Sequence, residues 1–491
     1  MRGGSRGDEE SAASPGYVTV GLSSSRPRVD PLGAGKSRQP LSGLSDCLGS
    51  TTIDTPSEIA ADTGADTFAA ASADTAPGST AGAFRALRHR NFQLFFGGQL
   101  TSLIGTWMQS VAQGWLVLKL TNSAFALGLV SFAGYIPVLV VTLFAGVVVD
   151  HVDRRRLIIG TQILLMISAF VLAGLSWFGV VRVEQVIILA AFNGLVSAFD
   201  MPGRQAFVVD MVGREDLPSA IALNSMIFNG ARVIGPAIAG LLIAVIGVSG
   251  CFFLNGISYI AVIWSLFEMR VPVRAVTRLG ADMMKHLREG LSYIWAHKAS
   301  WYLLVVVALN CGFAVQYTVL IPVFAQNVLH RGARGYGFLL AAQGTGALIG
   351  GLAIASRSEA KALRHNLIFG IFAAAVGILT FGLSHSMWLS LAAQTLVGAG
   401  LINHMVTTNT MLQLFVSDDL RGRVMSMYTL SFIGLAPLGS LEVGIIGERV
   451  SPQAAVLGCA AIALVCGVVM LSRLKLIAAA QTKIEGASHA A

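Results

Sequence analysis

The sequence predicts an all-α membrane protein with twelve transmembrane helices in two pseudo-symmetric halves of six. The first observation is composition: 54% of the residues are hydrophobic and only 12% are charged, with a mean hydropathy of +0.69. Soluble domains carry about 25% charged residues. The second is that residues 92 to 475 consist of long apolar stretches separated by short loops. The third is that these loops alternate in positive charge.

Each apolar stretch is long enough to cross a bilayer once, because a helix needs about 20 mainly apolar residues to do so. Six of them fall in an N-terminal half, residues 84–270, and six in a C-terminal half, residues 301–475. The predicted spans are 92–118, 123–149, 157–179, 185–207, 219–245, 250–270, 301–326, 336–356, 364–384, 386–412, 422–445 and 453–475.

The distribution of Lys and Arg predicts the orientation, since these residues are retained on the cytoplasmic side during insertion. One set of loops is rich in them, including the arginine run 154–156. We therefore expect both termini and the loop between spans six and seven in the cytoplasm. The formal net charge of +8 then reflects topology, and nucleic-acid binding is not expected. The opposite loops carry only Lys119, Arg182, Arg331, Arg334 and Arg449.

Three segments outside the spans are predicted to be cytoplasmic. Residues 1–83 are rich in Ser, Ala, Gly, Thr, Asp and Pro, a composition that cannot bury enough apolar surface to order the chain. We expect a disordered tail there, either regulatory or the product of an over-extended gene start. Residues 271–300 mix apolar and basic side chains, which suits a linker with a helix on the membrane surface. Residues 476–491 form a second tail.

No motif predicts a cofactor, a metal site or enzymatic chemistry. Residues 33–37, Gly-Ala-Gly-Lys-Ser, resemble the end of a phosphate-binding loop, but Asp30 stands where that motif requires Gly. The five cysteines have no metal-ligand spacing. The energy for any transport must therefore come from a gradient or a partner.

The two halves repeat in sequence. The loop at residues 212–219 parallels residues 416–423, and Pro236 and Pro437 follow at matching places in the next spans. Asp216 and Asp419 are both expected to precede helix starts, where an acid favours the positive helix end. Transporters built from such repeats bind their substrate at the interface between the repeats.

Polar residues inside the spans predict where that path lies, because an unpaired polar side chain in lipid is costly. In span one they are spaced by three and four residues, which aligns them on one helix face. Spans one, four, seven and ten occupy matching places in the repeat, so their polar residues could line a shared cavity. Alternatively, some only hydrogen-bond neighbouring helices. The predicted cavity residues are Gln99, Ser102, Thr106, Gln109, Gln113, Asn193, Ser197, Asn310, Tyr317, Asn403 and Thr407.

Four ionisable residues at membrane depth are candidates for charge or proton coupling: Asp200, Arg232, Glu442 and His404. Arg232 requires a carboxylate, carbonyl or water partner. Asp200 could carry a proton if it is desolvated. The structural alternative is an ion pair of Asp200 with Arg204 or Arg232 that stabilises helix packing.

Residues 146–155, Gly-Val-Val-Val-Asp-His-Val-Asp-Arg-Arg, resemble the signature G-x-x-x-D-R-x-G-R-R of the major facilitator superfamily. His151 and Asp153 depart from that pattern. The resemblance covers roughly residues 92 to 475 and implies the major facilitator fold. It assigns Gly146, Asp150, Arg154 and Arg155 to a cytoplasmic gate between inward-facing and outward-facing states.

A second resemblance lies in span five. Gly235, Pro236 and Gly240 match part of the family's antiporter motif, which implies export. A further arginine that the family places in span four would fall at Ala190 and is absent. Residues 200–207, 222–225 and 231–232 are similar to the branch that contains enterobactin exporters and macrolide efflux proteins. Members of this branch are mostly inner-membrane exporters, so the resemblance implies that the protein lies in the inner cell membrane.

The resulting hypothesis is a secondary transporter, not an enzyme, that exports an amphipathic small molecule, siderophore-like or drug-like, by alternating access with proton antiport. We expect a monomer in the lipid bilayer, with a small-molecule substrate and protons as its partners. Broad multidrug efflux, lipid transport, and a membrane sensor with the same fold are the alternatives.

Overall fold

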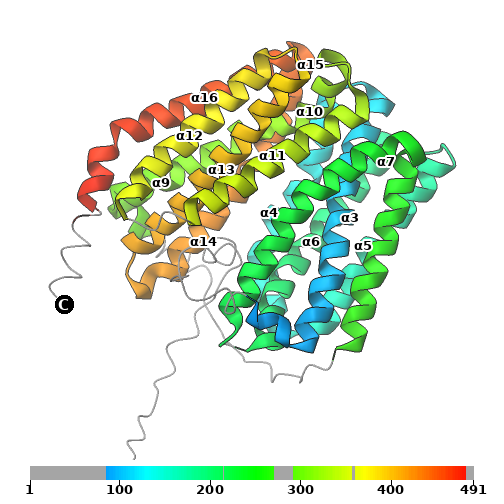
Figure 1. Cartoon of the computed structure of the whole chain (residues 1–491), viewed down its shortest axis with the longest axis horizontal. Helices are drawn as coiled ribbons and strands as arrows, with labels where there is room; N and C mark the ends of the chain where they lie inside the picture. Colours follow the sequence, from blue (N-terminus) through cyan, green and yellow to red (C-terminus); the bar gives the residue numbers. More distant parts are fainter. Residues whose placement is uncertain (1–83, 214, 270–290, 356–359, 481, 483–491) are drawn as a thin grey trace, which may run out of the picture. The chain divides into compact units, whose positions relative to one another are not determined.

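A computed structural model describes residues 84–213, 215–269, 291–355, 360–480 and 482 of the chain (Figure 1). All regular structure in these ranges is helical, without a strand. The predicted tail 1–83, most of the linker and residues 483–491 lie outside the described residues. Of the linker, residues 291–296 are helical, and Trp295 stacks on Trp301 with 4.2 Å between ring centroids.

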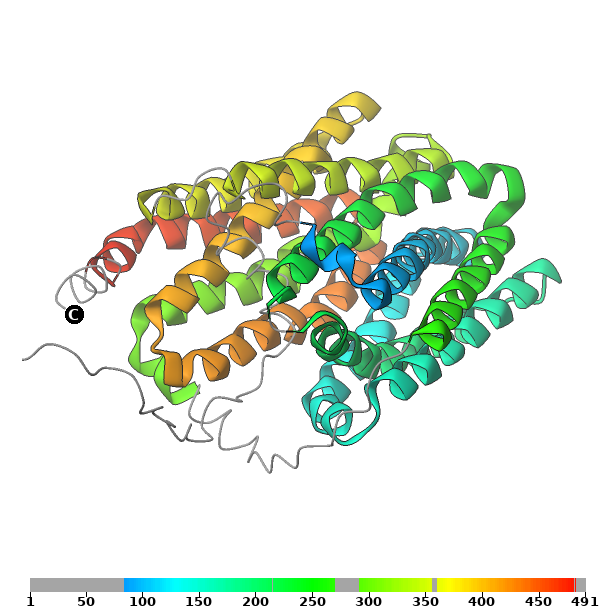
Figure 2. The same cartoon turned by 60° about the horizontal axis from the view of Figure 1, so that its bottom comes forward.

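The first half begins with a short 3-10 helix that leads into five long helices, coloured blue to green in Figures 1 and 2. The last of these contains two predicted spans, because Gly247 interrupts it with a φ of 71°, a conformation that favours glycine. The elements are η1 (Arg85–Arg88), α3 (Arg90–Thr121), α4 (Ala124–His151), α5 (Arg154–Trp177), α6 (Val183–Val212) and α7 (Leu217–Glu268).

The second half starts with a span made of several short pieces and continues with regular helices. Its elements are α9 (Lys298–Leu309), η2 (Asn310–Ala314), η3 (Val315–Leu320), α10 (Ile321–Val323), η4 (Phe324–Val328), α11 (Gly332–Ala355), α12 (Ala360–Leu383), α13 (Met387–Phe415), α14 (Asp418–Gly434), α15 (Ala436–Arg449) and α16 (Pro452–Ser472). Asp419 lies inside the first turn of α14, not before it as predicted, because the helix is capped at Ser417.

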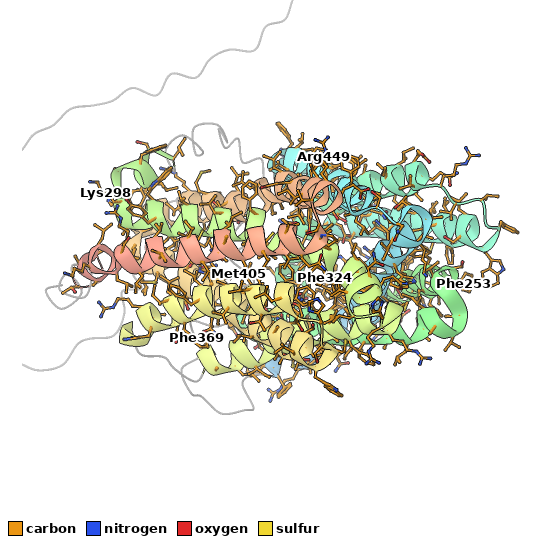
Figure 3. All side chains as sticks on the ribbon, turned by 90° about the horizontal axis from the view of Figure 1, so that it is seen from above. Phe253, Lys298, Phe324, Phe369, Met405 and Arg449 are labelled. Carbon is orange, nitrogen blue, oxygen red and sulfur yellow. The ribbon has the colours of Figure 1, made fainter. Side chains whose placement is uncertain are left out.

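The predicted fold class is confirmed. Within the described residues, ten helical segments are long and apolar enough to cross a membrane. One of them is α7, which holds two spans. Helix α3 is not among the ten, because its four glutamines lower its hydropathy. Large apolar side chains project outward along the helices, including Phe253 and Phe369 in Figure 3 and Trp264, which is 71% exposed.

Span seven departs from a regular helix for local reasons. The side-chain Nε2 of Gln316 donates to the carbonyl oxygen of Cys311 at 2.8 Å. Pro322 has no backbone N–H with which to bond the preceding turn. The chain therefore passes through π and 3-10 segments between Asn310 and Val328, and irregularities of this kind are frequent at functional sites.

The internal repeat is visible in the packing of the two halves. A Cβ atom on Gly194 in α6 would lie 2.1 Å from the carbonyl oxygen of Gly134 in α4. A Cβ atom on Gly398 in α13 would lie 1.8 Å from the carbonyl oxygen of Gln343 in α11. The two glycines allow the same close helix contact in each half, so α6 and α13 share a register.

Two helix pairs make most of the contact between the described parts of the two halves. Gly240 of α7 packs against Gly337 of α11, and Gly128 of α4 packs against Gly444 of α15. Small residues at such crossings let the backbones approach closely. The substrate path predicted from the repeat would run beside these contacts.

Candidate functional site

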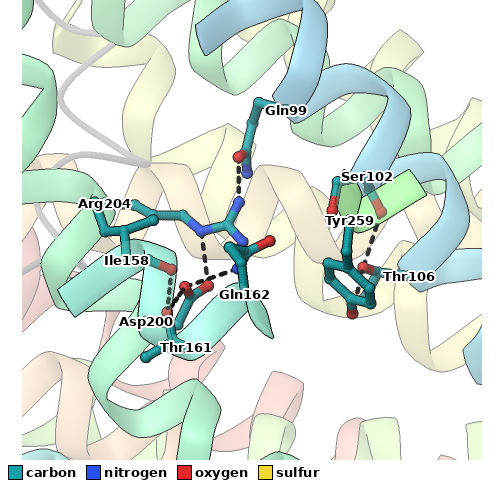
Figure 4. Close-up of polar contacts among 9 residues, drawn as sticks. All are labelled: Gln99, Ser102, Thr106, Ile158, Thr161, Gln162, Asp200, Arg204 and Tyr259. Carbon is teal, nitrogen blue, oxygen red and sulfur yellow. Dashed lines mark hydrogen bonds and ion pairs between the residues drawn. The ribbon is translucent and has the colours of Figure 1, made fainter. Parts of the chain in front are cut away.

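Asp200 is the centre of a buried polar cluster in the first half (Figure 4). Its Oδ1 accepts hydrogen bonds from Thr161 Oγ1 at 2.6 Å and Gln162 Nε2 at 2.9 Å, both on α5. Its Oδ2 lies 2.6 Å from Arg204 Nε, one turn further along α6. Both carboxylate oxygens of Asp200 therefore have partners.

Arg204 extends the cluster to a third helix, because its Nη1 donates to Gln99 Oε1 on α3. Of the two ion pairs that the sequence left open for Asp200, the structure contains the one with Arg204. The network ties together α3, α5 and α6, and a change of charge at Asp200 would be felt by all three helices.

Most polar side chains of the stripe in span one are buried among the helices of the first half. Ser102 is only 1% exposed, and Gln109 Oε1 accepts a 2.7 Å hydrogen bond from Asn255 Nδ2 in the second span of α7. Thr106 keeps exposed surface and lies 3.4 Å from the Tyr259 hydroxyl, and Gln113 is half-buried. The hydrogen-bonding alternative thus describes Gln99 and Gln109, and Ser102 is buried, whereas Thr106 and Gln113 retain accessible surface.

The two cavity residues predicted in span four have a different environment from those of span one. Asn193 and Ser197 of α6 are both half-buried. The Oδ1 atom of Asn193 is buried and has no hydrogen-bond partner among the described residues. The structure does not connect these two side chains to the Asp200 cluster through any hydrogen bond between described residues.

In the second half, Tyr317 joins three spans. Its hydroxyl donates to Gln394 Oε1 of α13 at 2.7 Å and lies 3.3 Å from Gln343 Nε2 of α11. Asn310 and Asn403 instead donate to backbone carbonyls of their own helices, those of Val306 and Ala399. Of the predicted cavity residues in this half, only Tyr317 makes a hydrogen bond between helices in the part of the chain that is described.

His404 and Thr407 are buried in α13 without full hydrogen bonding. His404 is 1% exposed, and its Nδ1 lies 3.4 Å from Thr408 Oγ1. Its Nε2 atom and the hydroxyl of Thr407 have no partner among the described side chains and backbone. His404 stands six residues after Gly398, as Asp200 stands six residues after Gly194. The two proton candidates therefore occupy equivalent positions in the repeat.

Arg232 and Glu442, the other two charged candidates, are not among the hydrogen-bond or ion-pair partners found for Asp200 and Arg204 in the described residues. The Arg232 guanidinium lies over the Trp107 ring, 5.8 Å from its centroid. No carboxylate of a described residue pairs with it. Glu442 of α15 is exposed and interacts electrostatically with Cys459 of α16.

Two arginines of the predicted gate motif bind neighbouring helices of the first half. Arg154 donates to Asp210 Oδ2 at 3.0 Å, and Arg155 donates to the carbonyls of Leu266 and Phe267 at the end of α7 at 2.7 and 3.0 Å. These are carbonyls that a helix end leaves unsatisfied. The structure does not describe the side chain of Asp150. A Cβ atom added to Gly146 would meet no neighbouring atom within 4 Å.

A further contact at the helix ends of the first half was not predicted. Asp216, which precedes α7, binds His89 Nε2 at 2.8 Å and Arg85 Nε at 3.0 Å, and Ser219 Oγ accepts from Ala86 N at 3.1 Å. The hydrogen bond from His89, and then the charge of Arg85, lower the pKa of Asp216. Helix η1 is thereby docked on the start of α7.

The partners Thr161, Gln162, Asn255 and Gln394 were also not predicted as site residues. Each is a polar residue in an otherwise apolar span, and that signal was available in the sequence. The rotation of each helix about its axis, which decides which polar faces meet, was not.

Comparison with known proteins agrees with this architecture. A family model described as transmembrane secretion effector matches residues 81–490. The staphyloferrin A transporter of Staphylococcus aureus (strain NCTC 8325 / PS 47) is 27% identical over 72% of this chain and 89% of its own length. The multidrug efflux pump Tap of Mycolicibacterium fortuitum is 27% identical over 75% of this chain and 92% of its own length.

Among solved structures, a bacterial homologue of the iron transporter ferroportin superposes with a TM-score of 0.62 at 15% sequence identity, covering 78% of this chain and 98% of that chain. At this identity the similarity concerns the fold alone. The match of the family model covers most of the chain, including every predicted span. The chain is a multi-pass membrane protein of the transmembrane secretion effector family, within the major facilitator superfamily.

Proposed function

We propose that this protein is a secondary active transporter that exports an amphipathic small molecule from the cytoplasm by alternating access, in exchange for protons. The observation that carries the proposal is its similarity to a siderophore transporter and to a drug efflux pump along about nine-tenths of their lengths. The substrate would be a siderophore-like metabolite or a drug. The protein would lie in the inner membrane as a monomer, with both termini in the cytoplasm.

The Asp200 cluster supports the proton step. A carboxylate can pair with Arg204, whereas a protonated carboxyl group has no charge to offer it. Protonation would therefore weaken the 2.6 Å ion pair inside α6 and release Arg204, which also binds Gln99 of α3. Because ion pairs in a low-dielectric interior are strong only while both partners are charged, one proton would change the contact between α3 and α6. His404 is the second candidate for the same role.

Accessibility divides the predicted cavity residues into two groups. Thr106, Gln113, Asn193 and Ser197 keep accessible surface at the middle of their spans, and we assign them to substrate contact. Residues that are buried and hydrogen-bonded to other helices or to their own backbone would instead maintain helix packing; these are Gln99, Gln109, Asn310, Tyr317 and Asn403. Ser102, which is buried on the same helix as Gln99, would also serve packing. Thr407, also fully buried, would lie behind the cavity wall.

The gate would work through the cytoplasmic helix ends. Arg154 and Arg155 hold α5 against α6 and α7, so the first half would move as one body. Gly240 and Pro236 of the antiporter-like motif pack α7 against Gly337 of α11, and Gly235 packs α7 against α3. Alternating access would then change the angle between the halves about these contacts.

The proposal is tested by comparing the source organism with and without this gene. Culture supernatant and cell extract would be analysed by untargeted mass spectrometry after iron-rich and iron-poor growth. We expect at least one metabolite to fall outside the cells and to accumulate inside when the gene is absent. Wild-type protein supplied in trans should restore its export, and Asp200→Asn at equal protein level should not.

Two results would count against parts of the proposal. Restoration of export by Asp200→Asn would remove the proton role of Asp200 and leave export itself intact. Unchanged metabolite profiles, together with unchanged accumulation of cationic and anionic dyes, would argue against export.

A further inference from the structure

Arg232 is a permanent charge at membrane depth. It lies 15 residues after Leu217, the first residue of α7, which corresponds to about 22 Å of helix at 1.5 Å per residue. A guanidinium stays protonated in proteins, and an arginine at the centre of a bilayer is costly unless something offsets its charge. The identity of its partner is therefore informative.

The described part of the chain provides no anion for Arg232. Both acids in the second part of α6 have other partners, because Asp200 is bound by Arg204 and Asp210 by Arg154. The ionisable groups that interact with the Arg232 charge are the phenols of Tyr135 and Tyr317, which are neutral at physiological pH. Glu442 is not among them. Asp200 already pairs with Arg204, so no carboxylate of a described residue compensates the positive charge of Arg232.

The contacts of α7 with its neighbours show which way the Arg232 side chain points. A Cβ on Gly235 would lie 2.6 Å from Trp107 Cβ on α3. A Cβ on Gly240 would lie 3.1 Å from Gly337 Cα on α11. One face of α7 thus contacts its own half and another face contacts the other half.

Arg232 lies between these two faces. At 3.6 residues per turn, it is displaced by about 60° from Gly235 and by about 80° from Gly240 around the helix axis. The exposed apolar residues Ile234, Leu241 and Val245 lie on the opposite side of α7. The Arg232 side chain, which is half-buried, therefore faces the junction of the two halves, not the lipid.

Aromatic rings surround the cation at this junction. Trp107 lies under the guanidinium at 5.8 Å, and Phe228 packs edge-on against Trp107 with 6.0 Å between ring centroids. Tyr135 on α4 retains 41% of its surface. A guanidinium held over an indole keeps its N–H groups free to bind an anion in the plane of the fork.

We propose that Arg232 and Trp107 form a binding subsite for an organic anion, in which the guanidinium binds a carboxylate and the rings of Trp107, Phe228 and Tyr135 contact the apolar body attached to it. The inference rests on the proposed transport function for the route by which a ligand reaches this depth. It narrows the substrate class to amphipathic carboxylates.

Binding of matched probes to the purified full-length protein in detergent tests the subsite. The probes are 2-naphthoate, 2-naphthalenemethanol and 2-naphthylmethylammonium, which share one ring system and differ in charge. We expect naphthoate to raise the thermal unfolding midpoint and the other two to have little effect. Because a hydrogen bond to a charged group contributes strongly, Arg232→Gln should weaken naphthoate binding by about tenfold or more.

Three control variants sharpen the result. Arg232→Lys keeps the charge but loses the bidentate fork, so its naphthoate affinity should fall between those of the wild type and Arg232→Gln. Trp107→Leu should weaken naphthoate binding more than it weakens binding of acetate. Arg449→Gln removes an exposed arginine at the end of α15 and should leave binding unchanged.

The subsite is overturned if Arg232→Gln binds naphthoate as well as the wild type does, if the ammonium probe stabilises the protein equally, or if no probe binds. Its failure can be told apart from failure of the proposed function. If the gene is needed to export a metabolite but Arg232 is not, the proposed function holds and the subsite is wrong. If naphthoate binding needs Arg232 but no compound is exported in a gene-dependent way, the subsite holds and the proposed function is wrong.

Discussion

Asp200 in the first half and His404 in the second half occupy the same place in the repeat, yet their surroundings differ. Asp200 has a partner for each carboxylate oxygen. His404 has one weak contact, and its Nε2 atom has no partner among the described residues. The repeat thus preserves the position of a buried ionisable group but not its bonding.

The difference comes from the neighbouring helix and from the next turn. The segment 157–160, Leu-Ile-Ile-Gly, in α5 parallels 367–370, Leu-Ile-Phe-Gly, in α12. In this alignment Thr161 and Gln162, the partners of Asp200, correspond to the apolar Ile371 and Phe372. Thr408 stands where Arg204 would be. The first half therefore has an ion pair and two side-chain hydrogen bonds at this position, whereas in the second half the residues corresponding to Thr161 and Gln162 are apolar.

Arg204→Met should give the clearest test of the difference between the surroundings of Asp200 and those of His404. It leaves Asp200 buried without its cation, and removing one partner of a buried pair costs about 3–5 kcal/mol. We expect a loss of this size in the apparent free energy of unfolding, measured by SDS titration. The double variant Asp200→Asn with Arg204→Met should recover most of it. A double variant as unstable as the single one would mean that the ion pair is not the source of the loss.

The equivalence of the two registers is tested by Gly194→Ala and Gly398→Ala. Each new methyl group would collide with a carbonyl oxygen, at 2.1 Å in α6 and 1.8 Å in α13. Overpacking of this kind typically costs about 1–3 kcal/mol, and we expect similar losses in both variants. Gly160→Ala is the matched control, because its Cβ meets no atom within 4 Å and alanine favours a helix. A loss in only one half would show that the registers are not equivalent.

His404→Leu should have a smaller effect than any change at Asp200. Because the Nε2 atom of His404 lacks a partner, its replacement removes an unsatisfied polar group and few hydrogen bonds. We expect the apparent free energy of unfolding to stay within about 1 kcal/mol of the wild-type value. A loss of several times this amount would indicate that His404 makes strong bonds that stabilise the second half.

The smallest predicted effect concerns the contact between η1 and the start of α7. The pKa of Asp216 is lowered by the hydrogen bond from His89 and the charge of Arg85. A group with a depressed pKa in the folded state stabilises that state above its ordinary pKa, and this stabilisation is lost as the pH falls through the depressed value. Since the ordinary value is about 3.9, docking of η1 should be complete at pH 6 and weaken below about pH 4.

Hydrogen exchange of residues 85–90 between pH 6 and pH 3, corrected for the intrinsic pH dependence of exchange, would measure this docking. Asp216→Asn should abolish the pH dependence while leaving the rest of α7 protected. Protection that is unchanged on acidification would contradict the role of the carboxylate.

The sequence predicted much of the architecture and little of the bonding. The position of the break between spans five and six was expected and coincides with Gly247. The spacing in span one predicts a polar stripe, and it leaves open which members line a cavity and which hydrogen-bond neighbouring helices. The structure separates them, because Gln99 binds Arg204 and Gln109 binds Asn255, whereas Thr106 keeps exposed surface. Spacing along one helix could not reveal which neighbour each side chain meets.

By itself the sequence determined that the chain is a helical membrane protein with a repeated half, because hydrophobic length and loop charge are local properties that decide where a chain inserts. It also identified Asp200, Arg232 and His404 as unusual groups at membrane depth. Only the tertiary structure decided that Asp200 is paired, that His404 is not, and that Arg232 faces the junction of the halves without a carboxylate. These outcomes depend on the rotation of each helix against its neighbours, which is set by packing and by close contacts such as that of Gly240 with Gly337.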